Sequence, residues 1–320
     1  MSKISEENII NHTIAFYNLE NLFDTINDPD IFDDDFTADA PKKWNQSRFK
    51  KKVRNLGHII NQIGFKDTKK PPSLIGVAEI ENAFVLQELI NSEHLKHTNY
   101  KFVHFDSNDE RGIDTALLYN VDCFEVLEKK IHEVYLEKEA GVQDYTRDIL
   151  YVKGKLDGVI VHVLVNHWPS RRAGVKLTEP QRIIASKTNI KIINSIRKVN
   201  TNAKIIVLGD FNDDPESNSI KAISNTSMYN PMELLLTRED GSLTFKGEWN
   251  LFDQIIISQN FLQGYGNNFR FKEAKIFNFH GAQVFEGVYK GHPFRTYAGP
   301  EYLGGISDHF PIYGVFTIHN

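Results

Sequence analysis

The sequence is short of cysteine, of excess basic charge and of long apolar runs. Its 320 residues include one cysteine, Cys123, which excludes an intrachain disulfide and a cysteine-based metal cluster. The net charge of -5 gives no global positive field of the kind expected for a dedicated nucleic-acid binder. No apolar run approaches membrane-spanning length. We therefore expect no membrane association, and phosphates could be contacted only by local groups of cations.

The composition is that of a soluble globular protein, with 41% hydrophobic and 25% charged residues. Residues 1–320 contain no internal repeat, no low-complexity tract and no linker, which predicts a single domain, and we expect a monomer. The first eleven residues are polar and lack the apolar core of a signal peptide. We expect a cytoplasmic protein, or a secreted one if a signal peptide has been removed.

The most informative stretch is the apolar run at residues 205–208, which is followed by Gly209, Asp210, Phe211 and Asn212. Its Ile and Val residues predict a buried strand. In an extended chain, residues two apart point the same way, so Asp210 and Asn212 are expected to project together. Open α/β sheets bind ligands at this end of their strands. An acid and an amide there suit water activation and phosphate binding, but the same residues are also common in ordinary turns.

Polar side chains border other β-prone apolar runs in the same way. They are Asn18 and Glu20 after residues 13–17, Glu79 after residues 74–78, His167 after residues 159–165, Asp253 before residues 254–258, and Asp308 and His309 before residues 312–318. Glu79 ends a nearly continuous apolar run, so its carboxylate needs a cation or a metal ion as a partner, and we favour a metal. A lone histidine at a strand end is structural about as often as functional. The repetition of the pattern favours one shared site.

Helical spacing of apolar residues predicts helices at residues 45–63 and 83–91, and a capping box at residues 178–181 predicts the start of a third. The basic residues of the first helix are expected on its solvent face. They are Lys50, Lys51, Lys52 and Arg54. The acidic segment at residues 28–35 lacks the Gly and Glu of a calcium loop, so we expect a solvated loop. Arg111 and Arg171 are weak candidates for phosphate binding, because loop arginines are more often solvated.

In chain order, these groups resemble the endonuclease/exonuclease/phosphatase superfamily, which includes pancreatic-type deoxyribonucleases, abasic-site endonucleases and inositol polyphosphate 5-phosphatases. The resemblance spans residues 13–316 and rests on Asn18, Glu79, Asn166-His167, Gly209-Asp210-Phe211-Asn212, Asp253 and Ser307-Asp308-His309. The amino-acid sequence of residues 16–24 and 166–171 looks most like that of predicted bacterial nuclease-like members. The resemblance implies a four-layer α/β sandwich, with two mixed β-sheets packed face to face and helices outside.

The resemblance also implies hydrolysis of phosphoesters with Mg²⁺, or Mn²⁺ as a substitute, since hard cations prefer oxygen ligands. The implied metal ligands are Glu79, Asp308 and Asn18. The implied catalytic residues are Asp210 and Asn212 for the water and the phosphate, His309 oriented by Asp253, and His167 for the phosphate or the leaving group. Whether Asp210 or His309 is the general base stays open, and so does a second metal position at Glu20.

Three functions are compatible with this pattern. The first is a nuclease acting on DNA or RNA, which the sequences of these motifs and the candidate phosphate-binding residues Arg111 and Arg171 favour. The second is a phosphatase or phosphodiesterase for a small substrate such as an inositol phosphate or a lipid head group, which the acidic net charge favours. A degenerate binding module ranks last, because all the implied catalytic residues are present.

Overall fold

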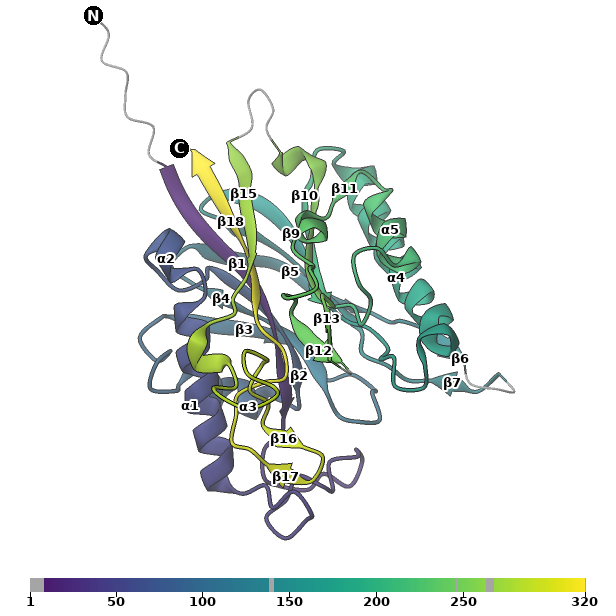
Figure 1. Cartoon of the computed structure of the whole chain (residues 1–320). Coiled ribbons are helices and arrows are strands. Elements are labelled where there is room, and N and C mark those ends of the chain that lie inside the picture. Colours follow the sequence, from purple (N-terminus) through teal and green to yellow (C-terminus); the bar gives the residue numbers. More distant parts are fainter. Residues whose placement is uncertain (1–8, 138–140, 246, 263–267, 320) are drawn as a thin grey trace, which may run out of the picture.

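Two six-stranded mixed β-sheets form the centre of the molecule (Figure 1). The computed structural model describes residues 9–137, 141–245, 247–262 and 268–319. The first sheet has the order β15-β18-β1-β2-β4-β3 and the second the order β11-β14-β10-β9-β8-β5. In each sheet the central pair is parallel, β1 with β2 and β9 with β10, and its neighbours are antiparallel.

The first sheet contains β1 (Ile9–Leu22), β2 (Leu74–Ile80), β3 (Tyr100–His104), β4 (Asp114–Asn120), β15 (Phe269–Ile276) and β18 (Ile312–His319). The second contains β5 (Phe124–His132), β8 (Ile149–Leu156), β9 (Val159–His167), β10 (Lys204–Asp210), β11 (Met228–Tyr229) and β14 (Asp253–Ser258). Three small ribbons pair β6 (Leu136–Glu137) with β7 (Gln143–Asp144), β12 (Leu243–Phe245) with β13 (Glu248–Asn250), and β16 (Tyr297–Ala298) with β17 (Glu301–Tyr302).

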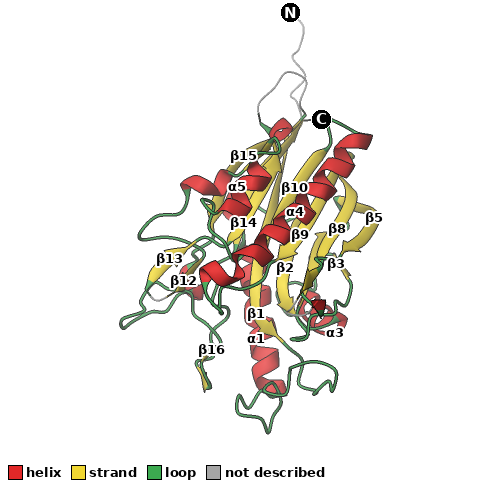
Figure 2. Ribbon diagram, turned by 90° about the vertical axis from the view of Figure 1, so that its right-hand side faces the viewer, coloured by secondary structure: helices red, strands yellow, loops and turns green. Residues whose placement is uncertain are grey.

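The helices are α1 (Gln46–Gln62), α2 (Phe65–Thr68), α3 (Ala83–Ile90), α4 (Val175–Val199) and α5 (Asn218–Ser224). Short 3₁₀ turns are η2 (Pro231–Leu234), η3 (Gln259–Phe261) and η4 (His280–Ala282). Figure 2 shows α4 and α5 lying over the outer face of the second sheet, and Figure 1 shows α1 on the opposite side of the molecule.

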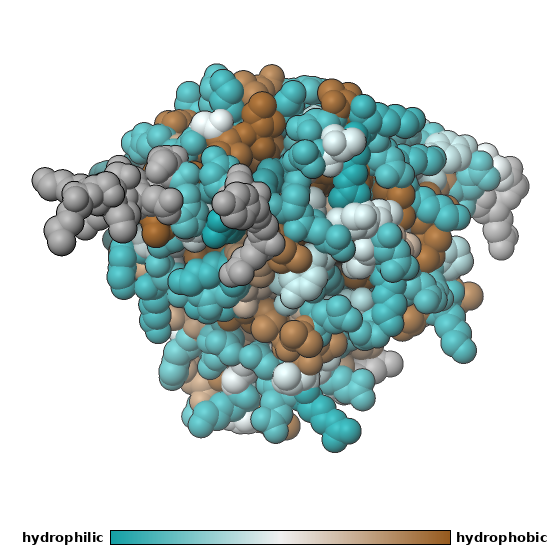
Figure 3. All heavy atoms as spheres, turned by 90° about the horizontal axis from the view of Figure 1, so that it is seen from above, coloured by the Kyte–Doolittle hydropathy of each residue, from teal (hydrophilic) through white to brown (hydrophobic). Residues whose placement is uncertain are grey.

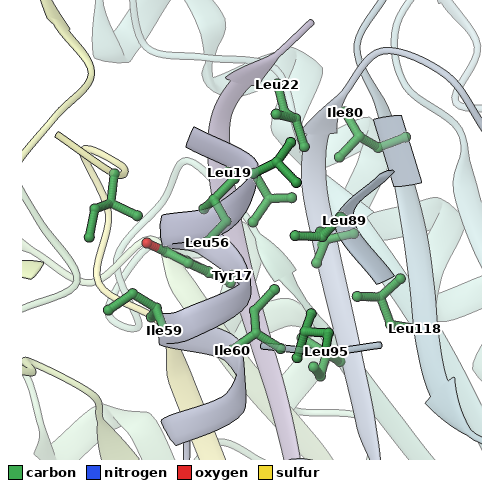
Figure 4. Close-up of a cluster of buried hydrophobic side chains, with 14 of the residues drawn as sticks. Tyr17, Leu19, Leu22, Leu56, Ile59, Ile60, Ile80, Leu89, Leu95 and Leu118 are labelled. Carbon is green, nitrogen blue, oxygen red and sulfur yellow. The ribbon is translucent and has the colours of Figure 1, made fainter. Parts of the chain in front are cut away.

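Strand alternation explains why the layers stack. Ile14 and Phe16 belong to the core between the two sheets, while Ala15 and Tyr17 belong to the core between the first sheet and its helices. Figure 4 shows this outer core, where Tyr17 lies among apolar side chains of α1 and neighbouring strands. A third core packs α4 and α5 on the second sheet. Three cores separate four layers, which confirms the predicted α/β sandwich.

Two local predictions are wrong. Lys52 is 2% exposed and not on the solvent face of α1, whereas its basic neighbours on that helix are exposed. The acidic segment is a loop with four exposed acids, as expected, and only Asp33 is buried, where its Oδ2 accepts a hydrogen bond from the Asp28 N–H at 3.0 Å. The third helix starts at Val175, before the expected capping box. Arg182 supports this extra turn by donating hydrogen bonds to the carbonyl of Val175 and the hydroxyl of Thr178.

Within the described residues, no helix is both long enough and apolar enough to cross a bilayer. Figure 3 shows the upper face of the molecule, where hydrophilic side chains predominate and apolar ones form small separate patches.

Candidate active site

The ends of the two central parallel strand pairs and the start of β14 bring five of the predicted residues together. The register places His167 beside Asp210 and Asp210 beside Asp253 in the second sheet. Asn18 lies in β1 and Glu79 in β2 of the first sheet. The Asn18 side chain bridges the sheets by donating to Asp210 Oδ2 at 3.0 Å. His167 Nε2 lies 3.8 Å from Glu79 Oε1 and 3.7 Å from Asp210 Oδ2.

Four non-glycine residues at these strand ends have left-handed backbones. They are Glu20, Asn21, Glu79 and Asn212, with φ of 50°, 50°, 59° and 49°. The strand register shifts at Glu20–Asn21 and again at Glu79, so both strands are bulged where they meet the site. The Asn21 N–H donates to Glu79 Oε2 at 2.9 Å and the Asn212 N–H donates to Asp210 Oδ1 at 2.9 Å. The carboxylates thus fix the bends, and such backbone strain clusters at functional sites.

The extended geometry expected from Asp210 to Asn212 is not found. β10 ends at Asp210, and the left-handed Asn212 turns its side-chain amide to the carbonyl of Trp168, to which it donates at 3.0 Å. The two residues lie together because the Asn212 backbone N–H binds the Asp210 carboxylate, and not because their side chains share one face of a strand.

His309 and Asp253 form a buried pair. His309 Nδ1 lies 2.7 Å from Asp253 Oδ2, which leaves Nε2 on the other side of the ring. Burial would lower the pKa of His309, but the carboxylates of Asp253, Asp210 and Asp308 raise it well above its usual value. The geometry therefore favours a positively charged imidazole whose orientation is set by Asp253.

Asp210 is the most constrained acid of the site. Burial and the neighbouring charge of Asp253 raise its pKa to about 7, against the opposing effects of His309 and of hydrogen bonds from Asn212 and Asn18. Catalytic bases work best with a pKa near the operating pH. Asp210 has this property and is fully held in place by its neighbours.

His167 has the opposite character. Burial and the charges of Arg147 and Arg111 lower its pKa well below the usual value, so the ring is neutral at pH 7. Its Nδ1 has no hydrogen-bond partner among the described residues, and its Nε2 faces the carboxylates of Glu79 and Asp210. A neutral ring can donate one hydrogen bond to a phosphate oxygen.

A comparison with protein-family models matches residues 13–318 to the Endonuclease/Exonuclease/phosphatase family. The chain belongs to this family. Its members hydrolyse phosphoesters with a divalent metal, so the general reaction class and the need for a metal follow from membership. A comparison with curated proteins found no match.

Solved structures of the endonuclease/exonuclease/phosphatase fold resemble the chain over nearly its whole length. A family protein of Bacteroides thetaiotaomicron has a TM-score of 0.61 at 17% identity, covering 98% of this chain and 97% of that chain. The TDP2 protein of D. rerio with a single-strand DNA product has a TM-score of 0.57 at 15% identity, covering 96% and 98%. A mannosyl-6-phosphatase of Bacteroides thetaiotaomicron has a TM-score of 0.54 at 17% identity, covering 95% and 98%. These likenesses confirm the fold.

The acidic side chains near Glu79 have the chemistry that a divalent metal ion requires. Glu20, Glu79 and Asp308 all act electrostatically on the buried ammonium of Lys52, so their charges converge. Burial and the charge of Asp308 raise the pKa of Glu20 to about 7, even though Lys52 and a 2.6 Å hydrogen bond from the Thr296 N–H oppose this. Three carboxylates around one ammonium, without a thiol among them, suit a hard cation such as Mg²⁺ or Mn²⁺.

The two arginines expected at the phosphate differ in their surroundings. Arg111 is close to the site, because its Nη2 donates to Asn21 Oδ1 at 2.9 Å and Glu79 acts on its charge. The guanidinium of Arg171 instead binds Asp213 at 2.8 Å and Asp214 at 3.2 Å. Its charge is compensated within the protein, which argues against the expected role in substrate binding.

Two buried cations of the site were not found from the sequence. Lys52 lies three residues after Phe49 and four before Leu56, so its place in the apolar stripe of α1 was an available signal. Arg147 donates to Asp109 at 3.0 Å and to the Trp168 carbonyl at 2.7 Å, which is the carbonyl that also holds Asn212. No local pattern marks Arg147, because its partners lie far away in the sequence.

Proposed function

We propose that the protein hydrolyses phosphodiester bonds of DNA or RNA with bound Mg²⁺, for which Mn²⁺ can substitute. The observation that carries this proposal is the single buried site in which Asn18 and Glu79 of one sheet meet His167, Asp210 and Asp253 of the other. Water activation and phosphate binding are both available there.

We assign the metal to Glu79, Asp308 and Asn18, with Glu20 beside them. When bound, the cation supplies neutralisation of charge on the phosphate and on the leaving oxygen. Metal ligation by Glu79 is compatible with its backbone hydrogen bond from Asn21, because a carboxylate accepts several contacts.

The protein's own residues supply the proton transfers and the orientation. Asp210, fixed by Asn18 and Asn212, accepts the proton of the attacking water. His309, held by Asp253, presents Nε2 to the phosphate and stabilises its charge. Neutral His167 donates its Nε2–H to a phosphate oxygen or to the leaving group.

Nucleic acid is the substrate that local charge supports best. Arg111 adjoins Glu79, and Arg172 acts electrostatically on His167, so cations surround the acids although the whole chain is acidic. The TDP2 structure of D. rerio holds a single-strand DNA product, so this fold can accommodate a DNA strand. A small phosphoester is the second candidate, because a mannosyl-6-phosphatase shares the fold and the cavity at the site holds only about 230 Å³.

A substrate panel tests the proposal. We expect the purified, metal-depleted protein to cleave plasmid DNA, single-stranded DNA or RNA after Mg²⁺ or Mn²⁺ is added. Glu79→Gln and His309→Ala should abolish this cleavage, and Glu93→Gln, whose carboxylate lies on the surface, should not. Turnover confined to inositol phosphates or bis-p-nitrophenyl phosphate would favour the small phosphoester. Equal inertness of all variants with every substrate would reject hydrolysis.

A further inference from the structure

A cavity of about 230 Å³ opens beside the acids Glu20 and Asp308. Besides these two acids, it is lined by aromatic rings and by basic side chains. They are Phe36, Trp44 and Tyr297, and Lys42, Arg172 and Arg295. The cavity therefore joins the proposed metal position to a separate region of opposite charge.

Two of the three basic groups are uncommitted. Arg295 donates to Asp308 at 2.8 Å, so its charge is compensated. Lys42 and Arg172 make no ion pair in the part of the chain that the structure describes. The Lys42 ammonium lies 5.0 Å from the ring centroids of both Phe36 and Tyr297. Aromatic faces hold an ammonium in place without neutralising it, which leaves it available to an anion.

Backbone contacts hold the cavity wall together. The Tyr297 hydroxyl donates to the Lys42 carbonyl at 3.0 Å, which ties the loop before α1 to the β16–β17 ribbon. The Trp44 indole N–H donates to the Phe23 carbonyl at 3.0 Å, which ties the same loop to the end of β1. A wall fixed before binding loses little entropy when a ligand enters.

We propose that this cavity binds a second phosphate of the substrate, one ring unit away from the scissile phosphoester, through Lys42 and Arg172. The inference rests on the proposed function, because the first phosphate must lie at Glu79 and Asp308. Drug-sized ligands need roughly 300–1,000 Å³, so a cavity of about 230 Å³ takes one ring unit and not a longer chain. A nucleic-acid strand and a bisphosphorylated sugar both carry such a phosphate.

Calorimetric titration of the metal-loaded protein tests this binding mode. The paired ligands are thymidine 3′,5′-bisphosphate against thymidine 5′-monophosphate, and fructose 1,6-bisphosphate against fructose 6-phosphate. We expect the bisphosphate of at least one pair to bind about tenfold more tightly, the scale of one charge-assisted contact. The pair with the larger preference identifies the source of the second phosphate.

Variants of the cavity lining show whether the preference for bisphosphates depends on Lys42 and Arg172. Lys42→Gln should weaken bisphosphate binding and leave monophosphate binding unchanged. Arg172→Gln should weaken bisphosphate binding more than monophosphate binding, because Arg172 also acts electrostatically on His167. Lys43→Gln, an exposed neighbour outside the cavity lining, should change neither. The proposal is overturned if no bisphosphate is preferred, or if the preference persists in both cavity variants.

Hydrolysis of bis-p-nitrophenyl phosphate separates this inference from the proposed function, because that ester carries no second phosphate. If the protein hydrolyses this ester but shows no preference for any bisphosphate, the proposed phosphate binding in the cavity is rejected and the proposed phosphodiesterase activity is retained. A bisphosphate preference without hydrolysis of any ester would keep the binding site and reject the phosphodiesterase.

Discussion

Asp253 uses one carboxylate oxygen to hold His309, and its other oxygen has no hydrogen-bond partner among the described residues. Burial would lower the pKa of His309, and the carboxylate of Asp253 is the first of the neighbouring charges that raise it well above its usual value. The charge of His309 therefore depends on Asp253.

Replacing Asp253 with Asn should lower kcat about 10²- to 10⁴-fold, the usual contribution of an oriented acid or base. The amide has the same shape but cannot stabilise a charged imidazole, so the pKa of His309 should fall, and NMR titration of its ring would measure this. Asp122→Asn, at an exposed position, serves as the control. An unchanged kcat in Asp253→Asn would contradict the assigned role.

Lys52 neutralises buried acids from within the fold. Its Nζ lies 3.9 Å from Glu20 Oε2 and donates to Thr296 Oγ1 at 2.7 Å. Lys52→Met removes the charge and leaves Glu20 buried without it. We expect the free energy of unfolding of the metal-free protein at pH 8 to fall by about 3–5 kcal/mol, the scale for breaking a buried pair.

Urea denaturation measures this decrease in the free energy of unfolding, and a double variant shows whether lost charge or lost packing causes it. Lys52→Met combined with Glu20→Gln removes both charges, so part of the stability should return. If the double variant is as unstable as Lys52→Met alone, the loss comes from packing and not from charge.

Single residues were predictable where they follow an apolar run. His167 and Asp210 are the last residues of their strands, and Asn18 and Glu79 lie where the register of β1 and β2 shifts, so the change from apolar to polar residues marks all four. Arg147 was not predictable, because its burial depends on Asp109 and Trp168, which no local pattern connects to it.

At the scale of elements, strands with buried faces were predictable and edge strands were not. Asp157-Gly158 stands between two apolar runs and is a typical hairpin turn sequence, and it joins β8 to β9 with φ of 41° and 85° at its two turn residues. β5 was missed, because it is the edge of its sheet, most of its side chains are exposed and four of its nine residues are charged. The order of strands within each sheet depends on contacts between distant segments, which periodicity does not contain.

The two sheets approach each other closely at Gly76 of β2. A methyl group there would lie 2.2 Å from Leu208 Cδ1 of β10 and 3.1 Å from Val165. Gly76→Ala should therefore push the sheets apart and destabilise the protein by about 1–3 kcal/mol.

Leu208→Ala opens the space that this methyl group needs, although alone it should cost about 2–5 kcal/mol. We expect the double variant to lose less stability than the sum of the single variants, as thermal unfolding would measure. Strict additivity would contradict direct packing between Gly76 and Leu208.

At the scale of the whole molecule, buried acids make stability depend on pH. Burial raises the pKa of Glu20 and Asp210 to about 7 and that of Glu81 to about 8. Unfolded carboxyl groups titrate near pH 4, so between pH 4 and 8 the folded state holds extra protons. Their stabilising contribution is complete below about pH 4 and is lost as the pH rises through 7 and 8.

Metal-free protein should accordingly become less stable from pH 6.5 to pH 8, as thermal unfolding in EDTA would measure. The measurement starts at pH 6.5 because two buried histidines have the opposite effect on stability at lower pH. Burial lowers the pKa of His12 to about 3 and that of His162 to about 4, so below pH 6.5 both residues make stability rise with pH. Glu81→Gln, which keeps an oxygen for the Asp24 N–H, should make the slope shallower. A stability that rises over this window would contradict the assigned carboxyl pKa values.

The pairing of β1 with β18 joins the two ends of the described chain, with Ile9 opposite His319 (Figure 1). A ribosome makes Asn18 and Glu79 first, and it makes Asp308, His309 and the strand β18 of the same sheet more than two hundred residues later. A nascent chain therefore carries only part of the hydrolytic site. We therefore expect a molecule cut short before residue 308 to be unable to hydrolyse phosphoesters, so the activity arises only after translation has passed this residue.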